Sequence, residues 1–349
     1  MRLALCELLG IELPIVQAPM AGAQGSALAI AVCKAGALGS LPCAMLSAET
    51  VREEVARMRA ATDLPFNLNF FCHRPPAADP QRETRWRALL APYFREYGID
   101  PSATPEGPAR LPFDGDAAAL VEALRPPIVS FHFGLPAPEL LARVKATGAK
   151  VISSATTVAE ARWLEANGVD AIVAQGLEAG GHRGMFLTDD PTTQLGTFAL
   201  LPQVVRAVRV PVIAAGGVAD ADAVAAALAL GAAGVQVGTA FLLCPEATTS
   251  AVHRSALASE AARHTALTNL FTGRLARGIV NRLMRELGPL NAAAPDFPLA
   301  ANAIAPLRAA AERAGSGDFS PLWCGQNATG CRAIGAAQLT RELTSKLRL

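Results

Sequence analysis

Short apolar segments alternate with helical patterns along most of this chain, and that alternation restricts the folds available to it. Strand–helix units in series favour a parallel sheet covered by helices. Several of the apolar segments are continuous, which is typical of parallel strands buried on both faces. Eight such units predict an α/β fold of the (β/α)8 TIM barrel type, although a doubly wound open sheet is an alternative, because a count of strands cannot show closure. The expected strands are Ile15–Pro19, Leu38–Leu41, Phe66–Phe70, Ile128–Phe133, Lys150–Ser154, Ala171–Ala174, Val212–Ala215 and Gly234–Val237.

Charge, cysteine content and the N-terminus exclude several classes of protein. The 31 basic and 30 acidic residues leave a net charge of +1, so we expect neither nucleic acid nor an anionic membrane as partner. The uncharged segment Ala223–Cys244 is long enough to span a bilayer, but its alanine and glycine content favours a buried helix followed by a strand. The seven cysteines are scattered without a CxxC pair, which favours a reducing, cytoplasmic compartment over disulfides or a zinc site. Glu7 and Glu12 interrupt the apolar N-terminal run, so we expect no signal peptide.

The clearest helical signal is a helix start, and two other regions interrupt the alternation. Thr157 and Glu160 have the spacing of a capping box, which predicts a helix that starts there. A proline-rich segment, residues 73–115, follows the third strand, contains a short helical stretch at Glu83–Leu90 and is placed to cover that end of the barrel. After Leu243 the β pattern stops, and residues 246–314 are expected to form helices and loops. Residues 321–349 form a final segment.

Glycine turns follow several strands at their carboxyl ends, which share one face of such a barrel and bind ligands there. Gly216-Gly217 follows the seventh strand, and Gln236–Thr239 ends the eighth. Backbone N–H groups in turns of this kind coordinate phosphate oxygens without a lysine. Together with Gly180-Gly181, they predict a site for a phosphorylated cofactor. The alternative is that the glycines only make short barrel turns.

Polar side chains at the same strand ends suggest further roles. Asn69 and Gln175 are placed either to hydrogen-bond a cofactor or to satisfy buried backbone groups. His132, at the carboxyl end of its strand, is a candidate general base, although a lone strand histidine is often structural. His182 and Arg183 either touch phosphate or substrate or only line the loop. No histidine–carboxylate grouping at metal spacing is present in the sequence, so no metal site is expected.

Seven motifs, in order from Pro14 to Gly330, give the chain a specific resemblance. They read PIVQAPMAG, FNLNFF, VSFHFGLP, AQGLEAGGHRG, IAAGGVAD, GVQVGTAFL and WCGQNATG. Together they resemble the nitronate monooxygenase family, formerly called 2-nitropropane dioxygenases. The resemblance implies an FMN-dependent barrel enzyme that oxidises alkyl nitronates, such as propionate 3-nitronate, with O2 to the carbonyl compound and nitrite or nitrate.

The resemblance also implies residue roles and an organisation into three parts. His132, in the SFHFG motif, matches the catalytic base of the nitronate-oxidising group. The return of Gln326 to the flavin implies an FMN-binding barrel (1–243), a smaller, mostly helical capping and substrate domain (244–317), and a segment that returns to the barrel (318–349). Asn327 follows the GQ pair where the family usually has glycine or alanine. The implied FMN-binding residues are Pro19, Met20, Ala21, Asn69, Gln175, Gly180, Gly181, Gly216, Gly217, Gln236, Val237, Gly238, Thr239 and Gln326.

Two other functions are compatible with these motifs. An NAD(P)H-dependent FMN reductase of the quinone reductase or enoyl-acyl-carrier-protein reductase type shares the GGH loop at His182. A non-catalytic flavin-binding protein is the other, and the strand-end His132 argues against it because binding alone needs no base. The expected partners are a small-molecule nitronate and O2, and the sequence leaves a homodimer open.

Overall fold

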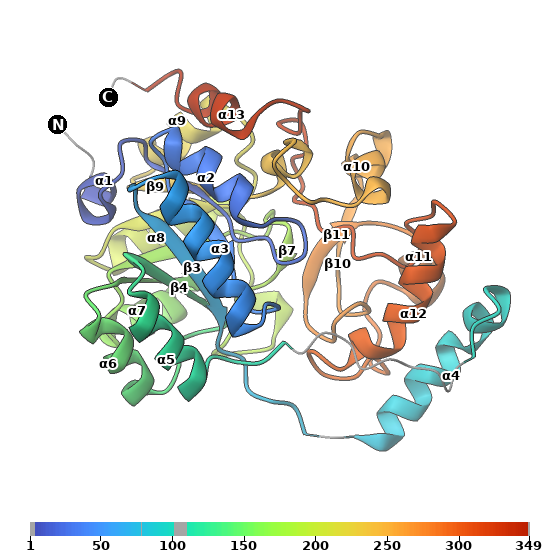
Figure 1. Ribbon diagram of the computed structural model, residues 1–349. Helices are drawn as coiled ribbons and strands as arrows, with labels where there is room; N and C mark the ends of the chain where they lie inside the picture. The colour runs from blue at the N-terminus through green and yellow to red at the C-terminus, as the bar shows by residue number, and fades with distance from the viewer. Residues whose placement is uncertain (1–3, 78, 101–109, 348–349) are drawn as a thin grey trace.

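The computed structural model describes residues 4–77, 79–100 and 110–347, and its largest sheet is a barrel of eight parallel strands (Figure 1). The order around the barrel is β1-β9-β8-β6-β5-β4-β3-β2. All eight predicted strands are confirmed, with ends that differ from the prediction by at most two residues. They are β1 (Ile15–Gln17), β2 (Gly39–Pro42), β3 (Phe66–Phe71), β4 (Ile128–His132), β5 (Lys150–Ala155), β6 (Ala171–Gln175), β8 (Val212–Ala215) and β9 (Gly234–Val237).

Hydrogen bonds between β1 and β2 close the sheet. Val16 and Leu38 form a parallel bridge, in which the Leu38 N–H donates to the Ile15 carbonyl at 2.9 Å and the Gln17 N–H donates to the Leu38 carbonyl at 2.9 Å. An open doubly wound sheet would leave the first and last strands of this order unpaired. The fold is therefore the TIM barrel.

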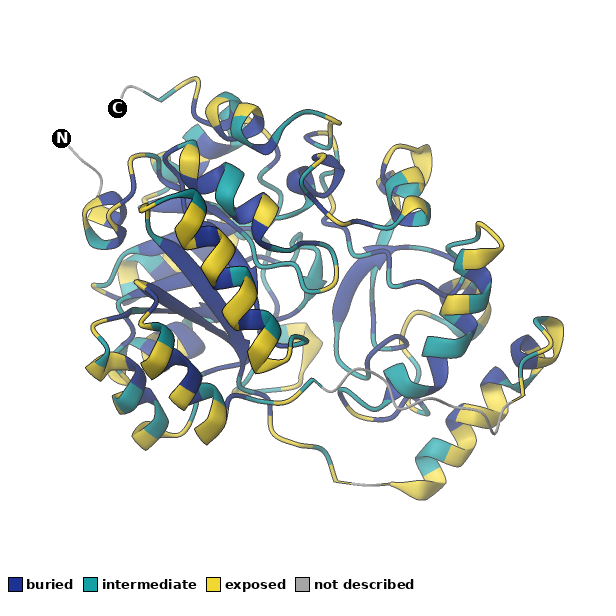
Figure 2. Cartoon of the chain, in the orientation of Figure 1, coloured by how far each residue is buried: buried dark blue, intermediate teal, exposed yellow. Residues whose placement is uncertain are grey.

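Helices cover the outside of the barrel with their buried faces turned inward (Figures 1 and 2). The short helix α1 (Ala4–Leu9) packs Leu5 and Cys6 against Ile128 and Ile213, near the amino ends of the strands. The uncharged segment after Ala221 divides into α9 and β9, and no helix of the described residues is long and apolar enough to cross a membrane. The outer helices are α2 (Ser26–Lys34), α3 (Ala48–Ala61), α5 (Gly115–Leu124), α6 (Pro138–Ala146), α7 (Val158–Ala166), α8 (Thr197–Ala207) and α9 (Ala221–Ala229).

The predicted capping box at α7 forms only in part. The Thr157 hydroxyl accepts from the Glu160 N–H at 3.1 Å, as expected. The fully buried Glu160 carboxylate does not turn back to the Thr157 N–H but accepts from the N–H and hydroxyl of Thr156 at 2.6 and 2.7 Å. It also accepts from the Phe186 N–H at 2.7 Å. Glu160 therefore fixes the loop after β6 as well as the start of the helix.

A second unit stands beside the carboxyl ends of the strands, and it contains a sheet that the sequence did not predict. The region expected to hold only helices and loops includes β10 and β11, which pair antiparallel. Gly181 and His182 form β7, a two-residue strand that pairs with β11. The loop after β6 is thus an edge strand of the second sheet. The elements of this unit are α10 (Ala251–Leu257), β10 (Thr265–Thr268), β11 (Ala276–Ile279), α11 (Arg282–Leu287) and α12 (Ala300–Arg313).

The proline-rich segment between β3 and α5 forms a longer helix than predicted, α4 (Pro80–Glu96), and this helix does not lie over the barrel (Figure 1), although Arg110 of the same segment lines the cavity at the carboxyl ends of the strands. Figure 1 shows α4 against the second unit, away from the barrel. The Trp86 indole N–H donates to the Ala300 carbonyl at 3.4 Å, and Arg282 pairs with Glu96 at 2.7 Å. The apolar face of α4 needs a partner, and α11 and α12 provide it. Residues 101–109 of the segment lie outside the described part of the chain.

The last segment runs back over the barrel. The Gly325 N–H donates to the Thr239 hydroxyl at 3.0 Å, and the Asn327 amide donates to the Gly217 carbonyl at 3.1 Å. Helix α13 (Ala336–Leu343) then packs on the barrel core through Ala336, Leu339 and Leu343. The short 3-10 helices are η1 (Pro191–Thr193), η2 (Thr239–Leu243) and η3 (Glu260–Arg263).

Candidate active site

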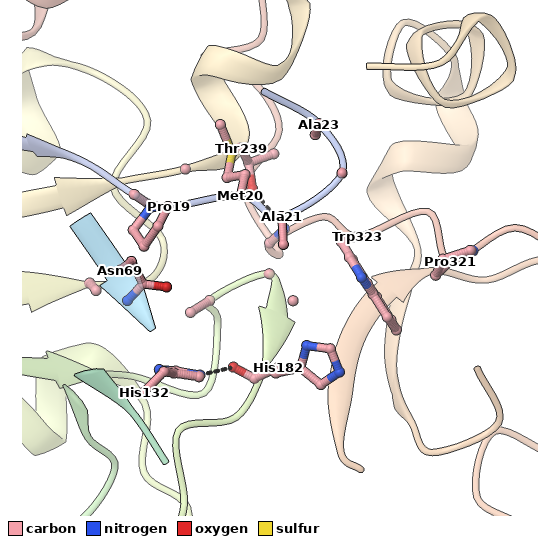
Figure 3. A pocket seen from close by; sticks show the side chains of 18 of the residues that line it. Pro19, Met20, Ala21, Ala23, Asn69, His132, His182, Thr239, Pro321 and Trp323 are labelled. Atoms are coloured by element: carbon pink, nitrogen blue, oxygen red, sulfur yellow. Dashed lines mark hydrogen bonds between the residues drawn. The ribbon is translucent and has the colours of Figure 1, made fainter. Parts of the chain in front are cut away.

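A cavity of about 330 Å³ lies between the carboxyl ends of the barrel strands and the second unit (Figure 3). Cavities of this size bind small ligands and cofactors. Most of the predicted cofactor-binding residues line it. They are Pro19, Met20, Ala21, Asn69, Gln175, Gly180, Gly181, Gly216, Gly217, Gln236, Gly238 and Thr239.

Two of the predicted cofactor residues do not line the cavity. The Val237 side chain points into the apolar packing between strands and helices and is 1% exposed. Its neighbours Gln236 and Gly238 line the cavity, because successive side chains of a strand face opposite sides. Gln326 is exposed, and its N–H donates to the Glu178 carbonyl at 2.9 Å. The returning segment meets the cavity through the residues on either side of Gln326 instead.

The glycine turns after β8 and β9 present unpaired backbone donors to the cavity. Within the described chain, the N–H groups of Gly217, Gly238 and Thr239 donate to no protein acceptor. Gly216 and Gly217 have φ of 114° and 74°, a left-handed backbone that favours glycine. A Cβ at Gly216 would meet the Thr197 hydroxyl at 2.8 Å, whereas a Cβ at Gly217 would have no neighbour closer than 3.7 Å. Glycine is thus required at Gly216 by contact and at Gly217 by conformation.

The glycine loop after β6 is held by two buried side chains. The Gln175 amide donates to the His182 carbonyl at 2.9 Å and accepts from the Gly184 N–H at 2.8 Å. The fully buried Arg183 guanidinium donates to the Gln175 and Gly176 carbonyls at 2.7 and 2.6 Å. Arg183 therefore braces the loop from behind. Both polar atoms of the Gln175 amide bond to the loop, so Gln175 holds the loop in place at the wall of the cavity. We call this arrangement the Gln175 clamp.

His132 lies at the end of β4, and both of its ring nitrogens have hydrogen-bond partners; Figure 3 shows the bond to the His182 carbonyl. Its Nε2 is 3.2 Å from the His182 carbonyl, which only accepts, so Nε2 carries the proton. Its Nδ1 is 3.1 Å from the Ser154 hydroxyl, which then donates to it. Burial, with minor contributions from Arg274 and Arg183, lowers the pKa of His132 to about 4. The ring is neutral at pH 7, and no free lone pair faces the cavity.

His182 is held by the second sheet, and its ring lies on the cavity side of β7 (Figure 3). Its Nε2 is 2.9 Å from the Thr272 hydroxyl, which has the Arg274 carbonyl as its own acceptor at 3.4 Å. The Thr272 hydroxyl has one proton, which either the His182 Nε2 or the Arg274 carbonyl accepts, and His182 Nδ1 has no hydrogen-bond partner among the described residues. The ring lies between Phe297 and Trp323, with centroids at 5.3 and 5.4 Å. Burial first, then the charge of Arg110, lowers the pKa of His182 well below its usual value.

Asn69 belongs to a hydrogen-bonded group at the end of β3. Its amide N–H donates to the Ser130 hydroxyl at 2.9 Å, and the Asn67 amide donates to the same hydroxyl at 2.8 Å. Asn69 is 5% exposed and lines the cavity, and its carbonyl oxygen has no protein donor among the described residues. The Asn69 carbonyl oxygen is thus left to accept a hydrogen bond from a bound ligand.

The second unit contributes a cavity wall that the sequence did not reveal. Trp323 lies in a recognised motif, but nothing local marked Arg110, Thr249, His253 or Arg308, and only the three-dimensional structure brings them to the cavity. The His253 ring Nε2 donates to the Trp323 carbonyl at 3.0 Å, and burial lowers the pKa of His253 to about 4. The buried Thr249 hydroxyl has no hydrogen-bond partner in the described chain.

Comparison with known proteins decides the family. Residues 2–346 match the profile of the nitronate monooxygenase family. A nitronate monooxygenase of Paraburkholderia phytofirmans is 47% identical over 354 aligned positions, covering 99% of this chain and 95% of that protein. The chain belongs to the nitronate monooxygenase family. The resemblance drawn from the motifs is confirmed.

Two solved structures of similar proteins have the same barrel fold as this chain. A nitroalkane oxidase from Streptomyces ansochromogenes has a TM-score of 0.88 at 39% identity, covering 99% of this chain and 97% of that one. FabK from Thermotoga maritima has a TM-score of 0.72 at 27% identity, covering 99% and 96% of the two chains. The protein is an oxidoreductase of a flavoenzyme family. The names of its relatives support the oxidation of nitronates as its general activity.

Proposed function

We propose that this protein is an FMN-dependent nitronate monooxygenase that oxidises alkyl nitronates, propionate 3-nitronate among them, with O2 to the carbonyl compound and nitrite or nitrate. One observation carries the proposal. A single cavity joins the unpaired backbone N–H groups of the glycine turns to a histidine ring with a free Nδ1 in an aromatic wall. That combination supplies an anion site for a cofactor and a proton acceptor for a substrate.

The residues of the barrel end fit FMN. The N–H groups of Gly217, Gly238 and Thr239 would hold the phosphate, since three unpaired donors that line one cavity need acceptors. The free carbonyl oxygen of Asn69 would accept from the flavin ring beside Met20. FMN, when bound, accepts electrons from the substrate and passes them to oxygen.

The hydrogen-bond partners of the two histidines support His182 as the acceptor of the substrate proton. A neutral nitroalkane must lose its α-proton before oxidation, and the acceptor must have a free lone pair in the cavity. His182 Nδ1 has no hydrogen-bond partner among the described residues, whereas both nitrogens of His132 are engaged by the protein. We therefore assign the base to His182. His132 is a positioning residue that holds the His182 carbonyl, a role that differs from the catalytic base predicted from the sequence.

Two histidine variants test this assignment. His182→Asn should lower nitroethane oxidation by about 100- to 10,000-fold, the usual value of general base catalysis, and ethylnitronate oxidation much less. His132→Asn should lower both rates by a similar, smaller factor, because it shifts the loop without removing the base. Oxygen consumption is measured with both substrates. A selective loss of nitroethane oxidation in His132→Asn alone would return the base to His132, and failure of the wild type to oxidise either substrate would end the proposal.

The GGH loop at His182 also fits the reductase alternative. A flavin reductase that uses NAD(P)H would bleach its bound flavin quickly when mixed with NADH without oxygen. A nitronate monooxygenase should respond to ethylnitronate and hardly to NADH. Rapid anaerobic mixing, followed by the absorbance of the flavin, therefore distinguishes the two reactions.

A further inference from the structure

Two arginines from distant parts of the chain line the same cavity on the side of the second unit. Arg110 follows α4 in sequence and precedes α5, and Arg308 lies on α12. Within the described chain, Arg110 forms no ion pair. Arg308 donates through Nε to Glu312 at 2.7 Å, and its two terminal nitrogens have no acceptor among the described residues. The two guanidinium groups and Glu312 leave one positive charge unbalanced.

The cationic end of the cavity follows an apolar wall. Ala301, Ile304 and Ala305 line the cavity from one face of α12, and Arg308 continues the same face one turn later. Trp323 lines the cavity as well and is in ring contact with His182, at 5.4 Å between centroids. A ligand with its reactive carbon at His182 therefore has an apolar surface beside it and a guanidinium beyond.

The electrostatics agree with this arrangement. Arg308 lowers the pKa of Arg110, after the larger effect of burial, so the two like charges oppose each other. The charge of Arg110 also contributes to the lowered pKa of His182. By contrast, Arg274 has partners of its own, since it lies over the Phe133 ring at 4.2 Å and donates to the Met185 carbonyl. A bound anion would offset the repulsion between Arg110 and Arg308.

We infer that Arg110 and Arg308 form a subsite for a carboxylate carried by the substrate at the end opposite its nitronate carbon, with the apolar face of α12 along the carbon chain between them. The inference rests on the proposed function and adds the residues that select an acidic substrate. A guanidinium binds a carboxylate through two parallel hydrogen bonds, which a neutral chain end cannot replace. The i,i+4 pair of Arg308 with Glu312 accounts only for Nε and leaves the terminal nitrogens for the ligand.

The experiment compares two nitronates that differ only at the far end. Propionate 3-nitronate carries the carboxylate, and propyl-1-nitronate carries a methyl group in its place. Arg110→Gln and Arg308→Gln should each lower kcat/KM for propionate 3-nitronate by about 10- to 100-fold, the range for a hydrogen bond to a charged group, and change that for propyl-1-nitronate less than about threefold. Arg313→Gln, an exposed arginine of the same helix, is the matched control and should change neither.

Binding without turnover separates the subsite from the reaction. Succinate has two carboxylates at a similar spacing, and calorimetric titration of the holoenzyme should show its affinity falling by about 10- to 100-fold in both variants. Arg308→Lys should restore part of the affinity because it keeps the charge. Oxidation of both nitronates with unchanged ratios in Arg110→Gln and Arg308→Gln would overturn the subsite. Oxidation of neither nitronate by the wild type would instead overturn the proposed function, while the succinate titration still tests the subsite.

Discussion

The Gln175 clamp gives the most specific prediction from this structure. Gln175→Leu removes both hydrogen bonds to the glycine loop at nearly constant side-chain volume, so it creates little cavity. The Gly184 N–H, now 2.8 Å from the amide oxygen, would be left buried without an acceptor. The His182 carbonyl would keep one donor, since His132 Nε2 is 3.2 Å away. The two losses are therefore unequal.

The magnitude follows from that difference. An unpaired buried N–H costs about 1–3 kcal/mol, and a lost hydrogen bond whose acceptor keeps another donor costs about 0.5–1.5 kcal/mol. We expect Gln175→Leu to lower the free energy of unfolding by about 1.5–4.5 kcal/mol in total. Because the loop carries His182, nitroethane oxidation should fall as well.

Urea unfolding of the FMN-saturated protein measures the change. Gln203→Leu on α8 is the matched control: its amide donates to the Ala199 carbonyl at 2.8 Å on the surface, and its loss should change the free energy of unfolding by less than about 0.5 kcal/mol. Equal stability of Gln175→Leu and the wild type would refute the clamp. If Gln175→Leu lowered the affinity for FMN and left the free energy of unfolding unchanged, Gln175 would contact the flavin, as expected from the sequence.

Three further predictions concern the flavin site and the buried histidines. Gly217→Asp should release FMN by placing a carboxylate among the phosphate donors, whereas Gly217→Ala, which has the same backbone strain but no charge, should retain more of it; mass spectrometry of the heat-released cofactor identifies and quantifies it. Asn69→Leu should weaken FMN binding by about 1–3 kcal/mol in a fluorescence titration, and equal affinity would exclude the contact. The pKa values of His132 and His253, near 4 and below their usual 6.5, mean that the unfolded chain binds protons first as pH falls. Stability should be full above pH 6.5 and decline towards pH 4 by about 1.4 kcal/mol per pH unit for each histidine, and constant urea midpoints over that range would contradict the burial of both rings.

The two histidines show what motif resemblance leaves open. His132 and His182 both lie in recognised motifs, and the sequence favoured His132 because it ends a strand and its motif matches the one that holds the family's catalytic base. The choice depends on which ring nitrogens the protein already uses, and those partners are Ser154 and Thr272. Their separations in sequence are 22 and 90 residues, so no local pattern identifies them.

The sequence by itself determined the eight strands, the family and most of the cavity lining, because each of these depends on residues close together in the chain. Apolar runs such as Val212–Ala215 form buried strands whatever their neighbours, and glycines with positive φ mark turns. Closure of the barrel, the second sheet and the position of α4 required the tertiary structure. Each depends on pairings between distant segments, such as β7 with β11 and Trp86 with Ala300, and strand propensity in a four-residue segment is too weak to predict such a pairing.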